Sequence, residues 1–192
     1  MIYRISRDSL LDRFVIWNSY LKKKVHLIAC GGTAMTLLGI KDSTKDIDLI
    51  VPDAKEYEYL TKSLKAIGYV QTGAHRWKSE DIFVFDIFKG NFVHTTELIE
   101  PPLKEGNHIL FKEMSFICLG VLNDYDLIIS KLFRGTQVDI DDCLALVKYR
   151  GAAIDLKNLE GRYRETASYS ISENKINRNL DLFLERIKEG IQ

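Results

Sequence analysis

Two aspartates at the start of an apolar run limit what this chain can fold into more than any other feature. The hexapeptide DIDLIV begins at Asp46. Its alternation predicts a β-strand with Asp46 and Asp48 on one face and Ile47, Leu49 and Val51 turned to a core on the other. An ionised carboxylate in an apolar interior costs several kcal/mol unless something compensates it. The strand must therefore begin at a polar site.

Carboxylates that share one strand face can bind a divalent cation. Asp46 and Asp48 would lie about 6 to 7 Å apart on a strand that rises roughly 3.3 Å per residue. Mg²⁺ takes one or two protein carboxylates and fills its other positions with water and phosphate oxygens. Asp86, inside the apolar segment IFVFDIF, could join them from a neighbouring strand. There it would bind metal or accept a proton from a hydroxyl; an acid satisfied by a nearby lysine is the structural alternative.

A glycine pair supplies a second element of the predicted site. Gly31 and Gly32 follow the apolar segment VHLIAC and precede a predicted helix over 33–39. Backbone N–H groups in such a turn can approach a triphosphate closely, and Thr33 adds a hydroxyl. An ordinary turn is the alternative for the glycines alone. Together with the aspartates, the pair predicts a metal–nucleotide site.

The periodicity predicts an α/β fold with a helical C-terminal part. Strands are expected at 25–30, 46–51 and 81–88, with weaker ones at 108–111 and 115–119, and helices at 8–24, 33–39 and 53–67. From Asn123 onward the spacing is helical and predicts three or four helices. We therefore expect a core domain over 1–121 and a helical subdomain over 122–192 that packs on it.

The charge balance gives no global sign of a nucleic-acid or membrane partner. Basic and acidic residues number 27 each. No apolar run approaches the ~20 residues that cross a bilayer, so we expect a cytoplasmic protein without a membrane segment. An RNA partner would need a local basic patch, and the candidates are Lys22–Lys24, Arg134, Lys148, Arg150, Arg162 and Arg164. A solvated set of charges is the alternative.

The segment GGTAMTLLGIKDSTKDIDLIV resembles the signature of the DNA polymerase beta-like nucleotidyltransferase superfamily, in which a strand and a glycine pair precede Asp-x-Asp. Enzymes of that superfamily bind a nucleoside triphosphate with Mg²⁺ or Mn²⁺ and transfer a nucleotidyl group to a hydroxyl, releasing pyrophosphate. The resemblance implies a nucleotidyltransferase-fold mixed sheet flanked by helices, followed by a C-terminal helical bundle. It also implies that the glycine pair and Thr33 bind nucleotide and that Asp46, Asp48 and Asp86 hold metal.

Within the superfamily, STKDIDL is most similar to the minimal prokaryotic branch that includes AbiEii-type and MenT-type toxin nucleotidyltransferases. Lys41 stands where many of its members have arginine, and with Lys45 it is an implied nucleotide contact. The later segment DLIISKLFRGTQVDIDDCLAL resembles that branch's helix lysine followed by Asp-x-x-Asp. By this resemblance Lys131 and Asp142, with Asp139, bind or orient the triphosphate.

The resemblance implies transfer from a nucleoside triphosphate to an RNA (tRNA-like) or protein hydroxyl, by a toxin with an antitoxin partner. Nucleotidyltransferases of lincosamides and aminoglycosides usually carry a basic residue and histidine before Asp-x-Asp, where this chain has Ser43, Thr44 and Lys45. A small-molecule acceptor, antibiotic or sugar, is therefore the second hypothesis. A non-catalytic module that binds nucleotide or a partner is the third, and a solvated helix face is the alternative for Lys131 and Arg134.

Overall fold

The computed structural model describes residues 4–79 and 83–190, and its centre is a seven-stranded mixed sheet. The strands of this sheet are β2 (Val25–Ala29), β4 (Asp46–Val51), β5 (Val70–Gln71), β6 (Arg76–Lys78), β7 (Val84–Lys89), β10 (His108–Glu113) and β11 (Ile117–Leu122). Their spatial order is β10-β11-β2-β4-β7-β6-β5. The pairs β11–β2 and β4–β7 are parallel, and the other neighbours are antiparallel. Two short pairs lie outside it, β1 (Ile5–Ser6) with β3 (Ser43–Thr44) and β8 (Phe92–Val93) with β9 (Thr96–Glu97).

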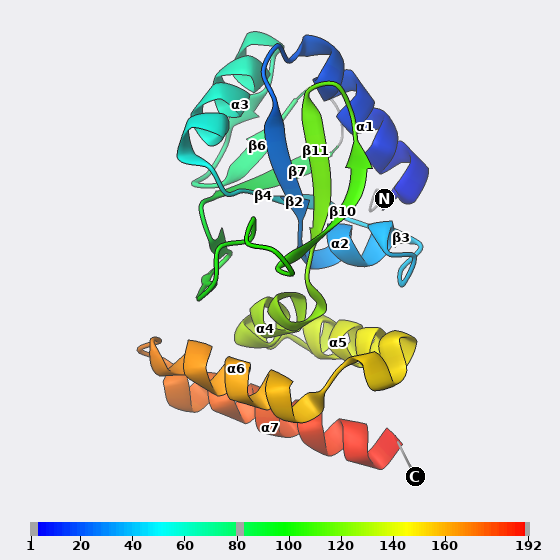
Figure 1. The fold of residues 1–192 in the computed structure, drawn as a ribbon, viewed down its shortest axis with the longest axis vertical. Helices are drawn as coiled ribbons and strands as arrows, with labels where there is room; N and C mark the ends of the chain where they lie inside the picture. The colour runs from blue at the N-terminus through cyan, green and yellow to red at the C-terminus, as the bar shows by residue number, and fades with distance from the viewer. Residues whose placement is uncertain (1–3, 80–82, 191–192) are drawn as a thin grey trace.

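Helices flank the sheet and then continue as a separate stack. They are α1 (Arg7–Tyr20), α2 (Gly31–Leu37), α3 (Ala54–Ala66), α4 (Asp124–Arg134), α5 (Gln137–Arg150), α6 (Leu156–Ser168) and α7 (Glu173–Gly190), with a 3₁₀ turn at Gly151–Ala153. In Figure 1, α4 and α5 form a layer beneath the sheet, and α6 and α7 form the layer below that. The predicted fold class is confirmed. No helix in the described ranges is both long and apolar enough to cross a membrane.

The larger part of the core lies between the sheet and the helices α1 and α3. Trp17 of α1 packs against Phe85 of β7 with ring centroids 4.8 Å apart, and its indole N–H donates to the Tyr69 hydroxyl at 3.0 Å. A smaller cluster on the other face includes Ile50 and Phe88. Because β4 is covered on both sides, its aspartates can meet solvent only where the strand begins.

Local boundaries differ from the sequence-based expectations at several elements, among them β11, which covers Ile117–Leu122 instead of 115–119, and β10, which extends to Glu113. The first helix ends at Tyr20, so the three lysines after Leu21 lie beyond it. The helix expected from Thr33 begins at Gly31, because the glycine pair forms its first turn. Strand β7 begins at Val84, and the start of the predicted strand, residues 81–82, lies outside the described residues.

The sheet passes into the helical stack through a single residue. β11 ends at Leu122, α4 begins at Asp124, and the Asn123 side chain accepts a hydrogen bond from the Asp126 N–H at 2.9 Å. The Asn123 amide also donates to the carbonyl of Asn107 at 3.0 Å, which ties this junction to the loop before β10. The junction therefore places the start of α4 directly beneath the strand ends. The division into two domains stays a prediction.

Candidate active site

The structure brings the three predicted carboxylates together at the ends of two parallel strands. In the register of β4 and β7, Asp48 lies opposite Asp86, and Asp46 is two residues earlier on the same face of β4. All three line one pocket, of about 380 Å³, between the sheet and the helices α4 and α5. Asp48 and Asp86 are buried, each with 7% of its surface exposed. Three acids on one face of a sheet make a strongly anionic surface.

The glycine pair lies directly against Asp48. Gly31 has a positive φ of 55°, and a Cβ there would lie 2.3 Å from Asp48 Oδ2, so only glycine fits. The Gly32 N–H donates to the same oxygen at 3.2 Å and lines the pocket. Thr33 is buried, and its hydroxyl accepts from the Asp48 N–H at 2.8 Å and donates to the Asp46 carbonyl. The pair thus holds Asp48 in place, and the predicted nucleotide contacts of these three residues stay a prediction.

Within the described part of the chain, Asp48 has no lysine or arginine at ion-pair distance. Burial, with Asp86 and Asp46 nearby, raises its pKa to about 6, although Arg134 and Lys131 act in the opposite direction. The group closest to an ion pair with it is His94, whose Nε2 lies 3.7 Å from Asp48 Oδ1. Burial and the Arg134 guanidinium lower the pKa of His94 to about 4, so its ring is neutral at pH 7. Asp48 is therefore a carboxylate that favours a cation from outside the chain.

Asp86, by contrast, is held by an arginine that sequence reasoning missed. Arg76 on β6 lies opposite Asp86 in the antiparallel register, and its Nε and Nη2 donate to the two oxygens of Asp86 at 3.0 and 2.8 Å. The alternation in RWK marks a strand. Its pairing with β7 depends on a hairpin register that the sequence does not display.

The helical side of the pocket consists of buried ion pairs. Lys131 of α4 has only 2% of its side chain exposed, and its Nζ donates to Asp142 Oδ2 at 2.7 Å. Lys41 donates to the other oxygen of Asp142, also at 2.7 Å. Burial alone would raise the pKa of Asp142, but Lys131 and Lys41 lower it below its usual value. The alternative of a solvated helix face for Lys131 is therefore wrong.

Arg134 and His94 complete this side. Arg134 Nη2 donates to Asp139, and Nη1 donates to His94 Nε2 at 3.0 Å. His94 has a positive φ of 53° and packs on the Phe88 ring. Such strain in a non-glycine residue at a pocket points to a functional constraint. Nothing in the sequence marks His94, because it lies on the turn between β8 and β9, and its polar contacts, Arg134 and Asp48, are far from it along the chain.

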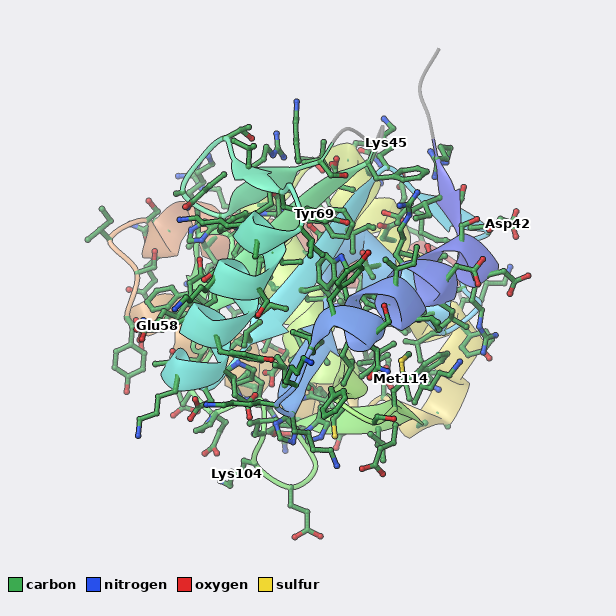
Figure 2. All side chains as sticks on the ribbon, turned by 90° about the horizontal axis from the view of Figure 1, so that it is seen from above. Asp42, Lys45, Glu58, Tyr69, Lys104 and Met114 are labelled. Atoms are coloured by element: carbon green, nitrogen blue, oxygen red, sulfur yellow. The ribbon has the colours of Figure 1, made fainter. Side chains whose placement is uncertain are left out.

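Six basic side chains and five carboxylates line the pocket, and their arrangement divides it into two sides. We call Asp46, Asp48 and Asp86 the sheet side, and Lys131, Arg134, Asp139 and Asp142, with Lys41, the helical side. Lys45 is exposed and, in the view of Figure 2, lies near the outer edge of the molecule. It reaches the pocket from its margin, beside Arg4, whose guanidinium bonds to Ser43.

The donor set fits a divalent cation on Asp46 and Asp48. No group of three His, Cys, Asp or Glu side chains that could hold a metal ion is found within 4–79 and 83–190. The bidentate bond to Arg76 occupies the third predicted ligand, Asp86. Two carboxylates with phosphate oxygens are nevertheless sufficient for Mg²⁺, and burial, the main cause of the raised pKa of Asp48, makes a bound cation favourable there.

The arginines proposed as part of an RNA-binding patch are neutralised by acidic partners. Each arginine of the set has an acidic partner: Arg134 pairs with Asp139, Arg150 with Asp124, Arg162 with Asp126, and Arg164 with Glu160 and Asp181. Lys24 pairs with Glu113. The sequence could not show this, because these acids lie on other elements or on the next helical turn.

Comparison with known proteins connects this fold to nucleotidyltransferases. A family model described as "Nucleotidyltransferase of unknown function (DUF6036)" matches residues 103–192. The solution structure of the antibiotic-resistance factor ANT(2'')-Ia aligns with a TM-score of 0.56 and 14% identity, covering 83% of this chain and 90% of that one. The search of curated proteins finds no match.

Two further structures align over more of the chain with lower scores. A crystal structure of ANT(2'')-Ia in complex with adenylyl-2''-tobramycin has a TM-score of 0.45 at 13% identity, covering 93% of this chain and 97% of that one. A candidate nucleotidyltransferase from H. pylori has a TM-score of 0.45 at 12% identity, covering 95% of each chain.

The fold is that of the nucleotidyltransferases, and with the family match it supports a transferase of that class. The matched family and the aligned structures carry names other than the toxin branch. The resemblance to the AbiEii-type and MenT-type enzymes therefore stays a prediction.

Proposed function

We propose that this protein transfers a nucleotidyl group from a nucleoside triphosphate to a hydroxyl of an RNA or protein acceptor, with the help of a divalent cation. The observation that carries the proposal is the arrangement of Asp46 and Asp48, which have no lysine or arginine at ion-pair distance within the described residues, opposite Lys131 and Arg134 across one pocket. Nucleotidyl transfer needs both a metal-binding side and a side that binds phosphate.

Each side of the pocket would have a distinct task. Asp46 and Asp48 would hold the cation, which when bound neutralises phosphate charge and polarises the reacting phosphoryl oxygen. Lys41, Lys45 and Lys131 would bind the triphosphate, for which Lys41 and Lys131 exchange part of their contact with Asp142.

In the reaction, the acceptor oxygen would bond to the α-phosphorus, and the bond from the α-phosphorus to the bridging oxygen would break to release pyrophosphate. The hydroxyl proton would pass to Asp86, which lies opposite Asp48 and is oriented by Arg76.

The test is transfer of label from an α-phosphate-labelled triphosphate, with Asp48→Asn as the inactive comparison. Asn keeps the size of the side chain and can still accept the Gly32 N–H, so the fold should survive. We expect labelled acceptor with the wild type and Mg²⁺ and at least a 1,000-fold lower rate with the variant, on the order of one lost transition-state contact of about 4 kcal/mol. Full activity of Asp48→Asn would refute the mechanism.

A small-molecule acceptor is the second candidate, and the fold similarity to ANT(2'')-Ia favours it. The paired arginines of the helical bundle also remove part of the support for an RNA acceptor. Parallel incubations with total RNA, with cellular protein and with a panel of antibiotics and sugars separate these acceptors, because only one fraction should carry label. Nucleotide binding without label in any fraction would favour the non-catalytic module.

The toxin role rests on the resemblance of STKDIDL and the helix-lysine segment alone. It predicts that production of the wild type arrests growth of a bacterial host, whereas Asp48→Asn does not. Co-expression of an adjacent antitoxin-like gene should relieve the arrest. Normal growth with an enzyme that is active in vitro would remove the toxin role and leave the transferase activity.

A further inference from the structure

Both carboxylate oxygens of Asp86 accept hydrogen bonds from Arg76. The guanidinium donates one hydrogen bond to each oxygen, at 3.0 and 2.8 Å, in the fork geometry that arginine forms with a carboxylate. The backbone fixes this arrangement, since Arg76 and Asp86 are direct partners in the β6–β7 register. Asp86 has 10% of its side chain exposed, whereas Arg76 has 49%, so the arginine covers the carboxylate from the solvent side.

Asp46 and Asp48 differ from Asp86 in this respect. Within the described residues, Asp46 has no basic side chain at ion-pair distance. Asp48 accepts a weak bond from the Gly32 N–H on one oxygen, and at the other oxygen the ring of His94 lies 3.7 Å away, beyond hydrogen-bond distance. Two of the three carboxylates are therefore open to an external cation, and the third already has one from the chain.

We propose that this site holds one divalent cation, on Asp46 and Asp48, and that Arg76 takes the place of a second cation by keeping Asp86 out of metal coordination. One divalent ion and one guanidinium together balance the formal charge of the three carboxylates. The proposal rests on the proposed function, because it concerns the metal content of that same site. Arg76 is a positioning residue that acts through Asp86.

The alternative is a surface ion pair that yields to a metal ion. An exposed ion pair contributes little, typically below about 1 kcal/mol, and a metal would displace it easily. This pair differs, because it is bidentate and its carboxylate is buried. Removing one partner from such a carboxylate leaves an uncompensated buried charge. A second cation would have to displace the Arg76 guanidinium from Asp86, although the β6–β7 register holds the two residues opposite each other.

The closing experiment counts metal ions. The full chain is titrated with Mn²⁺ in the presence of a saturating α,β-methylene nucleoside triphosphate, and free and bound Mn²⁺ are followed by electron paramagnetic resonance. We expect one bound Mn²⁺ per wild-type chain, with the spectrum of an isolated ion. Arg76→Ala should bind two, with the spin coupling of ions about 4 Å apart.

Two matched variants control for charge loss. Lys78→Ala removes a cation from the same face of β6, and Arg4→Ala removes a pocket cation that bonds to Ser43 and, among the residues the structure describes, to no carboxylate. Both should bind one Mn²⁺, as the wild type does. Coupled ions on the wild type, or one ion on Arg76→Ala, would overturn the proposal.

Asp86→Asn keeps the test decisive if Arg76→Ala does not fold. Since Asp86 is not a ligand here, this variant should bind Mn²⁺ within about threefold of the wild-type affinity, whereas Asp48→Asn should lose at least tenfold. An equal loss in the two variants would contradict the proposal. Mn²⁺ bound by the wild type without any transfer would refute only the proposed function, and no Mn²⁺ bound at all would refute both.

Discussion

On the sheet side of the pocket, neither Asp46 nor Asp48 has a lysine or arginine at ion-pair distance within the described residues, whereas on the helical side Asp139 and Asp142 are each bonded to basic residues at 2.7 Å or less. The pKa values follow this difference. That of Asp48 is raised to about 6, and that of Asp142 is lowered. A buried acid without a partner costs more folding free energy than a paired one, because the partner offsets part of the desolvation penalty. The helical side is thus preorganised, while the sheet side needs a ligand.

The largest expected effect separates the two sides by activity. Asp48→Asn should reduce nucleotidyl transfer by at least about 1,000-fold, because it removes a cation ligand. Asp142→Asn should reduce transfer by only about tenfold, since Lys131 and Lys41 remain to bind phosphate. Initial rates with labelled triphosphate measure both. Equal losses of transfer rate in the two variants would mean that the sheet side and the helical side contribute equally to catalysis.

Substitutions on the helical side should lower the free energy of unfolding more than substitutions of exposed residues do. Lys131→Met removes a buried cation from Asp142 and Asp139, and we expect it to lower the free energy of unfolding by roughly 3 kcal/mol. Lys148→Met, an exposed lysine of α5, is the control and should change it by less than about 0.5 kcal/mol. Urea unfolding measures the difference. A stable Lys131→Met protein would show that the pairing is not structural.

The two sides should also respond to pH with opposite sign. Because the folded pKa of Asp48 is raised, the metal-free wild type loses stability relative to Asp48→Asn as pH rises from about 4 to above 6. Because the folded pKa of Asp142 is lowered, its contribution is present above about 4 and is lost as pH falls below that. Unfolding of both asparagine variants beside the wild type at several pH values gives the two slopes. Slopes of the same sign would contradict this assignment.

A smaller effect on stability and Mg²⁺ binding tests why a glycine is needed at position 31, next to Asp48. Gly31→Ala and Gly39→Ala both place alanine at a positive φ, which costs about 1 kcal/mol. Only at Gly31 would the new Cβ meet Asp48 Oδ2, whereas at Gly39 nothing lies within 4 Å. We therefore expect similar losses of stability from backbone strain, with an additional loss of Mg²⁺-dependent stabilisation at Gly31 alone. Equal Mg²⁺ responses would remove the proposed role of this contact.

The sequence predicted the residues whose spacing is local and missed those that depend on tertiary register. The alternation in DIDLIV gave the common face of Asp46 and Asp48, and the apolar surroundings of Asp86 indicated a neighbouring strand. Arg76 and His94 enter the site through a hairpin register and a two-residue turn, which no short motif displays. The resemblance named Lys131 and Asp142, and their burial was visible only after α4 and α5 were packed.

The glycine pair and the basic residues show the same limit. The pair was expected to contact phosphate, and the structure adds a local reason for it in the closeness of Asp48. The arginines of the bundle were counted as free charge, because the sequence does not show that acids on neighbouring helices meet them. In both cases the contact joins residues that are far apart in the sequence, so it becomes visible only in the folded structure.

The stability of the wild type and Asp48→Asn at pH 7.5, with and without Mg²⁺ and a non-hydrolysable triphosphate, tests the central claim most directly. A carboxyl whose pKa rises to about 6 on folding costs roughly 3 kcal/mol, so the variant should be more stable without ligand. Ligand at about 100 times its dissociation constant adds roughly 2.7 kcal/mol to the wild type alone and should cancel that difference. A wild type that is already the more stable protein without ligand, or that gains nothing from Mg²⁺ and nucleotide, would contradict the account.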